Sequence, residues 1–289
     1  MDMNRRRFLQ YSASAVAAAS WGAPRIAWGE EAAAGTVATA KHVLGQTGIE
    51  TTFLGMGTGV RAGGNDSALH RRGEDKYMEV LEYVYDRGLR YMDMADMYGA
   101  HDLVRQAMAS FMDRDEMMLQ TKTFSRDAEG AVADLERYRQ ELDTDVIDVL
   151  LLHCLTDANW VNDMQETMDA LSEAKAAGHV RALGVSCHDF GAMEQAVESD
   201  WVDVMLARIN PHGSHMDGPV DEVQRLLQRA HDKGKGVIGM KILGEGTLAA
   251  DHINECLAFA RDLECLDAIT IGFLSPDEVD DCMQRLDEA

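Results

Sequence analysis

The chain has 289 residues, of which 46% are hydrophobic and 27% are charged, a composition typical of a folded globular protein. Asp and Glu number 50 and Lys and Arg 27, which gives a formal net charge of -23. So acidic a surface repels phosphate backbones, and the sequence contains no basic stripe with interleaved aromatic residues, so nucleic acid is not expected as a partner.

The N-terminal segment differs in composition from the rest of the chain. Three arginines at 5–7 are followed by Phe8 and by a mildly apolar run over 11–19 that is too short for a permanent membrane anchor. This order resembles the twin-arginine export signal, which carries already folded proteins across a membrane. We therefore expect a signal peptide over residues 1–29, recognised by the twin-arginine translocation machinery. The remainder, 30–289, is expected in the periplasm or outside the cell.

Beyond residue 44, short β-like runs alternate with amphipathic segments of helical period, which is typical of parallel β/α units. The eight β-like runs are 51–57, 90–95, 116–122, 146–152, 180–186, 202–208, 236–242 and 267–273. The helical segments between them are 75–87, 129–142, 163–177, 191–198, 220–233 and 251–263. We predict a single α/β domain, a (β/α)8 TIM barrel. The stretch LGQTGIETTFLGMG is expected to form a short N-terminal hairpin that plugs the bottom of this barrel.

Four polar residues, Asp93, Tyr98, Lys122 and His153, fall at or just beyond the ends of three predicted strands. In such barrels the catalytic side chains come from the C-terminal ends of strands. A carbonyl that receives hydride must also be protonated, and a tyrosine can donate this proton only if a neighbouring cation lowers its pKa of about 10. Lys122 is the candidate cation, Asp93 would keep it charged, and His153 would orient the carbonyl oxygen. The sequence thus predicts a carbonyl-reducing site.

Four segments resemble the aldo-keto reductase family: LGQTGIETTFLGMGTG, GLRYMDMADMYG, LERYRQELDTDVIDVLLLH and RALGVSCHDF. The likeness covers about residues 41–286. It implies that Asp93, Tyr98, Lys122 and His153 form the family's catalytic tetrad. It also implies an oxidoreductase that converts a small aldehyde, ketone or sugar to an alcohol, or the reverse, with NADP or NAD bound across the barrel mouth without a Rossmann domain.

The resemblance also implies which residues hold the dinucleotide. They are Gly57, Thr58, Ser186, Cys187, Asn210, Met240, Lys241, Gly272, Ser275 and Asp281. Four positions depart from the family pattern. Cys187 replaces a common asparagine, and Met240 replaces an aromatic ring that stacks on the nicotinamide. Glu278 replaces an arginine that binds the 2′-phosphate, and Cys282 replaces an asparagine that contacts the adenine. Because a carboxylate at 278 would repel that phosphate, NAD is expected to bind at least as well as NADP. Outside the cytoplasm there is no evident way to regenerate a freely exchanging cofactor. One resolution is a tightly held dinucleotide that is loaded before export and recycled by coupled oxidation and reduction of two substrates.

Two features leave alternatives open. His153, His188, His212 and His215 all follow strand ends, but no carboxylate-rich ligand set accompanies them, so we predict no metal and expect the last three to line or rim the pocket. The loop VRAGGNDSALHRRGED either closes over an anionic ligand or is a solvated loop whose arginines pair with acids. The alternative functions are a non-redox, metal-assisted barrel enzyme and a binding protein that has lost affinity for the cofactor.

Overall fold

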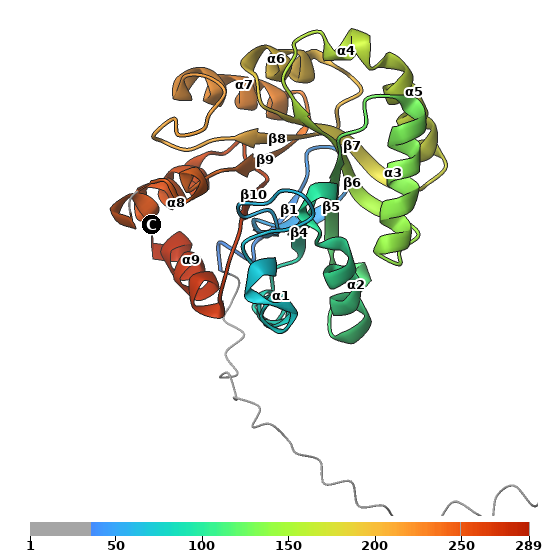
Figure 1. The fold of residues 1–289 in the computed structure, drawn as a ribbon. Coiled ribbons are helices and arrows are strands. Elements are labelled where there is room, and N and C mark those ends of the chain that lie inside the picture. The colour runs from blue at the N-terminus through green and yellow to red at the C-terminus, as the bar shows by residue number, and fades with distance from the viewer. Residues whose placement is uncertain (1–35, 249, 289) are drawn as a thin grey trace, which may run out of the picture. The chain divides into compact units, whose positions relative to one another are not determined.

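Eight parallel strands close into a barrel in the computed structural model, which describes residues 36–248 and 250–288 (Figure 1). The strands are β3 (Leu54–Gly57), β4 (Tyr91–Asp93), β5 (Met118–Thr123), β6 (Ile147–Leu155), β7 (Val180–Cys187), β8 (Val204–Arg208), β9 (Gly236–Met240) and β10 (Ala268–Ile271). They pair in chain order, and β10 closes the ring against β3 with Ile269 beside Leu54. Each predicted β-like run overlaps one of these strands, so the predicted fold class is confirmed. The predicted signal peptide lies outside the described residues and stays a prediction.

Helices cover the outside of the barrel (Figure 1). They are α1 (Glu74–Asp86), α2 (His101–Ser110), α3 (Ala128–Glu141), α4 (Trp160–Asp163), α5 (Gln165–Ala176), α6 (Phe190–Glu198), α7 (Val220–Asp232), α8 (Ile253–Asp262) and α9 (Pro276–Glu288). Short 3-10 helices are η1 (His70–Arg72), η2 (Asp96–Tyr98), η3 (Arg114–Glu116), η4 (Gly244–Gly246) and η5 (Ala250–His252). The sequence analysis did not predict α2 or α9. Within the described ranges, no helix has both the length and the apolar content required to span a bilayer.

The N-terminal hairpin of β1 (Lys41–Val43) and β2 (Glu50–Thr52) is antiparallel, as predicted. Its turn carries Leu44 and Ile49 into the interior cluster of the barrel, where both are buried. The backbone N–H of Gln46 donates to the carbonyl of Gly234 at 2.9 Å, and that of Gly45 donates to the Asp267 carboxylate at 3.2 Å. Since Gly234 and Asp267 immediately precede β9 and β10, the hairpin closes the N-terminal end of the barrel. The opposite end, where the strands terminate, is left for the site.

Candidate active site

Asp93 and Lys122 form a buried ion pair at the C-terminal ends of the neighbouring strands β4 and β5, with 6% and 1% of their surfaces exposed. The Lys122 ammonium donates to Asp93 and, at 2.7 Å, to the carbonyl of Met94. Gln120 Nε2 also donates to Asp93 at 2.8 Å, and Thr270 Oγ1 does so at 3.3 Å. Burial alone would lower the pKa of Lys122, but the charge of Asp93 and the hydrogen bond to it raise that pKa above its ordinary value. The lysine is therefore a fixed cation.

Tyr98 lies in η2, directly after β4, and its ring faces this cation: Lys122 Nζ is 4.9 Å from the ring centroid. Burial raises the pKa of Tyr98 above its ordinary value, although the charge of Lys122 and the hydrogen bond with it act in the opposite direction. The expectation that Lys122 would bring this pKa below its ordinary value is therefore wrong, because desolvation outweighs the cation. The phenol stays protonated and keeps the proton that it could donate.

Two glycines that the sequence analysis did not single out fix the position of Tyr98. A Cβ atom on Gly59 would lie 2.5 Å from the Cε2 and Cζ atoms of the Tyr98 ring, so only glycine allows the ring to pack here. Gly99 has a φ of 67°, and a Cβ atom there would lie 2.4 Å from the carbonyl oxygen of Asn65. The loop that follows β3 therefore packs directly against the segment that carries the tyrosine.

His153 lies at the end of β6, with its ring edge-on to that of Tyr98 at a centroid distance of 5.9 Å. Phe124 covers it, with ring centroids 4.3 Å apart. Burial, followed by the charge of Lys122, lowers the pKa of His153 to about 2, so its imidazole is neutral. Its Nδ1 atom is buried and has no hydrogen-bond partner among the residues that the structure describes. A neutral imidazole in this position can donate one N–H to a substrate oxygen.

Cys154 and His188 form a second polar pair beside His153. Cys154 interrupts the regular pairing of β6 and has a φ of 60°, a conformation that is uncommon for residues other than glycine. Its Sγ atom is 3.0 Å from Nδ1 of His188. Burial raises the pKa of the Cys154 thiol and lowers that of His188 to about 4. Both groups are therefore neutral, a thiol hydrogen-bonded to an imidazole.

A cavity of ≈ 350 Å³ runs from Asp93 and Tyr98 to Glu278 in the first turn of α9. Its lining includes four of the predicted cofactor residues, Gly57, Met240, Lys241 and Gly272. The other six predicted residues lie outside this lining; they are Thr58, Ser186, Cys187, Asn210, Ser275 and Asp281. The structure therefore brings together, at this cavity, the predicted cofactor residues that lie at the ends of β3, β9 and β10.

Most of the six outlying residues have contacts of their own. Thr58 donates to the carbonyl of Asp93 from its backbone N–H at 3.0 Å and from Oγ1 at 2.9 Å. Asn210 is fully buried and holds the loop after β8, as its Nδ2 atom donates to the carbonyl of Ser214 at 2.8 Å. Asp281 pairs with Arg285 at 2.8 Å on α9. Thr58 and Asn210 thus support the backbone around the site.

Three further residues of that set lie at the ends of two elements. Ser186 and Cys187 end β7 and are each 1% exposed. The hydroxyl of Ser186 has no hydrogen-bond partner within the described part of the chain. Ser275 directly precedes α9, where its Oγ atom accepts a hydrogen bond from the backbone N–H of Glu278 at 3.4 Å. Of these three residues, Ser186 is therefore the one whose buried hydroxyl is available to a ligand.

The charged groups at the cavity are mostly paired with each other. Lys241 forms an ion pair with Glu245, and both line the cavity. Glu278 accepts a hydrogen bond from the backbone N–H of Leu274 at 2.7 Å, so its carboxylate caps the turn before α9. Arg61 also lines the cavity.

Two arginines of the loop after β3 make different contacts. Arg71 pairs with Asp66 of the same loop at 2.6 Å, as the solvated alternative predicts. Arg72 reaches the loop after β10 and donates to the carbonyl of Leu274 at 3.2 Å. Since Leu274 lines the cavity, this loop also borders the mouth of the site.

The model of the Aldo/keto reductase family matches residues 54–260. The chain belongs to this family. It is similar to the aldo-keto reductase YhdN of Bacillus subtilis, with 30% identity over 50% of this chain and 45% of that protein. It is also similar to the methylglyoxal reductase DkgB of Salmonella typhi, with 29% identity over 45% of this chain and 49% of the relative. The alignments thus span about half the length of these curated relatives.

Among solved structures, the fold is similar to that of PA4992, an aldo-keto reductase from Pseudomonas aeruginosa. The TM-score is 0.73 at 18% sequence identity, and the match covers 88% of this chain and 96% of the other. A likeness at this identity concerns the fold, and it agrees with the closed barrel of this aldo/keto reductase family member.

Proposed function

We propose that this protein reduces a carbonyl group to an alcohol, or runs the reverse oxidation, with a nicotinamide dinucleotide. One observation carries the proposal. A protonated tyrosine, Tyr98, faces a lysine cation that a buried carboxylate holds, and both Tyr98 and Asp93 open onto one cavity. A bound dinucleotide supplies the hydride in this chemistry.

The residues of the chain supply the proton and the orientation. As the C=O double bond of the substrate opens, its oxygen takes the proton from the Tyr98 hydroxyl. The phenolate that remains is stabilised by the adjacent Lys122 ammonium, which Asp93 keeps charged. The neutral imidazole of His153 orients the substrate oxygen by a hydrogen bond, and its neutrality keeps it from competing with Tyr98 as the acid.

Loss of the tyrosine hydroxyl tests this role directly. The Tyr98→Phe variant of the full-length chain should lose about 10²- to 10⁴-fold in kcat, because it removes the acid and leaves the ring in place. Binding of the dinucleotide, followed by fluorescence, should be unchanged. Full activity in this variant would refute the proposed proton donor. If the wild-type chain folds but binds neither dinucleotide, the alternative of a binding protein that has lost affinity for the cofactor is favoured instead.

The cavity and its surroundings fit a dinucleotide at one end better than at the other. The buried, unpartnered hydroxyl of Ser186 suits a polar group such as the nicotinamide carboxamide. At the far end, the Glu278 carboxylate lines the cavity where family members commonly have a cation for the 2′-phosphate. Lys241 is already paired with Glu245. We therefore propose that NAD binds at least as well as NADP.

Reversing the charge at position 278 tests whether Glu278 sets the preference between NADH and NADPH. Replacing Glu278 by Arg should raise affinity for NADPH relative to NADH by at least about tenfold, since repulsion of a dianion becomes attraction. The matched variant Glu278→Gln removes only the repulsion and should give an intermediate change. Fluorescence titration of the wild-type chain with both reduced dinucleotides provides the baseline. A strong preference of the wild type for NADPH would overturn the assignment.

We propose a small aldehyde, ketone or sugar as the substrate, whose carbonyl oxygen would lie beside Tyr98 at one end of the cavity. Because one relative is named as a methylglyoxal reductase, methylglyoxal is the first compound to assay. Reduction is followed by the loss of absorbance of NADH or NADPH. Turnover of larger sugar aldehydes with no turnover of methylglyoxal would redirect the substrate assignment.

We also propose export by the twin-arginine pathway to the periplasm or cell exterior, with the dinucleotide loaded beforehand. The support is the sequence of the signal, Arg5 and Arg6 followed by Phe8 and Leu9. Replacing both Arg5 and Arg6 by lysine should retain the full-length chain in the cytoplasm in cell fractionation. Equal export of both forms would contradict this pathway. A purified protein that shows no nicotinamide absorbance after dialysis would contradict the preloaded cofactor.

A further inference from the structure

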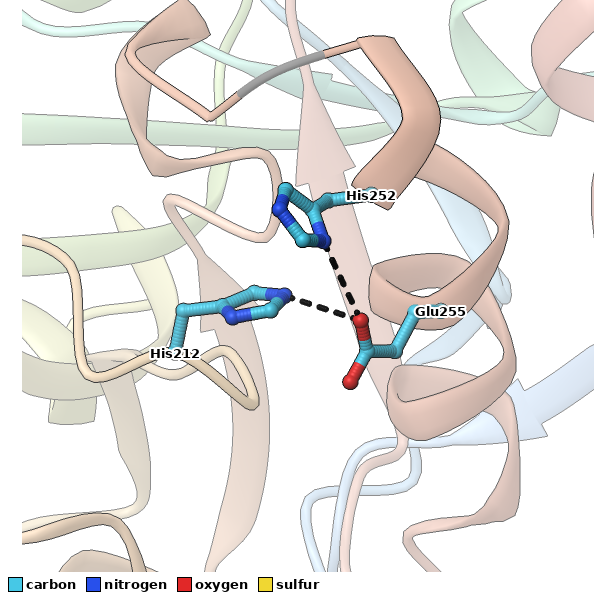
Figure 2. Close-up of side chains that lie close together, drawn as sticks. All are labelled: His212, His252 and Glu255. Atoms are coloured by element: carbon cyan, nitrogen blue, oxygen red, sulfur yellow. Dashed lines mark hydrogen bonds and ion pairs between the residues drawn. The ribbon is translucent and has the colours of Figure 1, made fainter.

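Three side chains with metal-ligating atoms converge outside the cavity (Figure 2). His212 comes from the loop after β8, His252 ends η5, and Glu255 belongs to the first turn of α8. His212 Nε2 lies 3.1 Å from Glu255 Oε2, and His252 Nδ1 lies 3.3 Å from the same oxygen. The three ligand atoms are all within 4.8 Å of one another. Figure 2 shows both imidazole rings directed at one carboxylate, His212 from the loop after β8 and His252 from the segment that leads into α8.

These separations match the edges of a tetrahedral zinc site. Zinc binds imidazole nitrogen and carboxylate oxygen at about 2.0–2.1 Å, so neighbouring ligand atoms in a tetrahedron are about 3.3 Å apart. The two nitrogen–oxygen distances, 3.1 and 3.3 Å, lie close to this value. The two imidazole nitrogens are within 4.8 Å of each other, so a tetrahedral ion bound here would draw the two rings together.

The backbone around the cluster is held in place by independent contacts. Asn210, which is fully buried, accepts hydrogen bonds on Oδ1 from the backbone N–H groups of His212 at 3.2 Å and Ser214 at 3.0 Å. On the other side, His252 and Glu255 are three residues apart at the start of α8, where their side chains are neighbours. A site whose ligands are already positioned has less entropy to lose when it binds an ion.

We propose that His212, His252 and Glu255 bind a divalent transition metal of the zinc class, with water completing the coordination. Two imidazoles and one carboxylate suit zinc, whereas magnesium and calcium prefer oxygen ligands alone. The bound metal links the loop after β8 to the start of α8.

None of the three ligands lines the cavity at Tyr98, so the site is separate from the reaction centre. It differs from the sequence-based prediction of no metal, which grouped His212 with His215 instead of with His252. His212 and Glu255 are exposed and His252 is partly buried, so the ion is accessible from solvent.

Metal titration of the full-length chain, prepared without a histidine tag, tests the site. Isothermal titration with Zn²⁺ in the presence of excess Mg²⁺ should show one tight site per chain, and Co²⁺ should give the absorption bands of a low-coordinate complex. His212→Ala, His252→Ala and Glu255→Gln should each weaken this binding by at least about tenfold. Because all three side chains are solvent-accessible, the variants should fold, which circular dichroism checks.

His215→Ala is the matched control, since His215 lies on the same loop but outside the cluster. Its affinity for Zn²⁺ should equal that of the wild type. Zinc binding that survives His252→Ala, or that falls equally in His215→Ala, would overturn the assignment. So would displacement of Zn²⁺ by millimolar Mg²⁺, which would indicate general attraction of cations to an acidic surface.

Discussion

The ion pair between Asp93 and Lys122 allows stability and catalysis to be separated by a double-mutant experiment. Lys122→Met removes the cation and leaves a carboxylate that is only 6% exposed and without its charge partner. Removing one partner of a buried pair costs about 3–5 kcal/mol. At about 2–4 °C per kcal/mol for a domain of this size, the melting temperature should fall by about 6–20 °C. Asp93→Asn should be destabilising for the reciprocal reason, because it leaves the lysine unpaired.

The double variant Lys122→Met with Asp93→Asn should recover most of the lost stability. Its neutral amide can still accept from Gln120, and no unpaired charge remains. Its activity should stay as low as that of Lys122→Met, since the cation beside Tyr98 is still missing. Thermal unfolding and kcat for methylglyoxal reduction measure the two effects on the same samples.

A buried lysine elsewhere serves as the control for this experiment. Lys235 is 7% exposed and its ammonium donates to the carbonyls of Ser199 and Val202, not to a carboxylate. Lys235→Met should lower the melting temperature and leave kcat unchanged. If the Lys122→Met and Asp93→Asn effects on stability simply add in the double variant, the pair is not coupled and the argument from a buried charge fails.

Two further predictions concern the tyrosine and the histidine. Gly59→Ala should lower kcat by at least about tenfold, because its Cβ atom would lie 2.5 Å from the Tyr98 ring. The control is Gly63→Ala, whose Cβ atom would have its nearest neighbour at 4.0 Å, and this variant should keep the kcat of the wild type. Equal kcat values in the two variants would contradict the packing argument. Carbonyl reduction requires protonated Tyr98 and neutral His153, so kcat/KM should stay flat from about pH 6 to 9 and fall only as pH rises through the raised pKa of Tyr98. A limb of the pH profile near 6.5 would show that His153 titrates in the working range.

The barrel could be predicted because each of its strands is marked by a short apolar run in the sequence. Runs such as 146–152 and 236–242 are mostly apolar, with one charged residue each, and the strands β6 and β9 that form there are almost wholly buried. The tetrad was predictable for a related reason, since residues that end parallel strands meet at one end of a barrel. The order of the segments thus placed Asp93 and Lys122 together before any contact was known.

Helices α2 and α9 were not predicted from the local sequence pattern. In α9 the buried residues Val279, Cys282, Met283 and Leu286 follow helical spacing, and Pro276 opens the helix, so the signal was present. The segment also resembles a cofactor-binding pattern, and six of its thirteen residues are acidic, which makes the apolar face less evident in the sequence. In α2 the buried residues Leu103, Val104 and Ala107 also follow helical spacing, so the signal was present there as well.

The properties that escaped prediction depend on distances between segments that are remote in sequence. The sign of the Tyr98 pKa shift is set by how much of the phenol is desolvated, and this follows from the packing of the loop that carries Gly59, not from the presence of Lys122. The convergence of His212 with Glu255 likewise joins the loop after β8 to α8.

The raised pKa of Tyr98 also bears on the direction of the reaction. Burial makes the phenolate costly, so Tyr98 favours the protonated form that carbonyl reduction needs. Alcohol oxidation needs the phenolate as the base, and only the Lys122 charge opposes that cost. The same residues therefore favour reduction near neutral pH and oxidation only as pH rises. Removing the lysine charge should consequently impair oxidation more than reduction, a ratio that kinetics of Lys122→Met in both directions would measure.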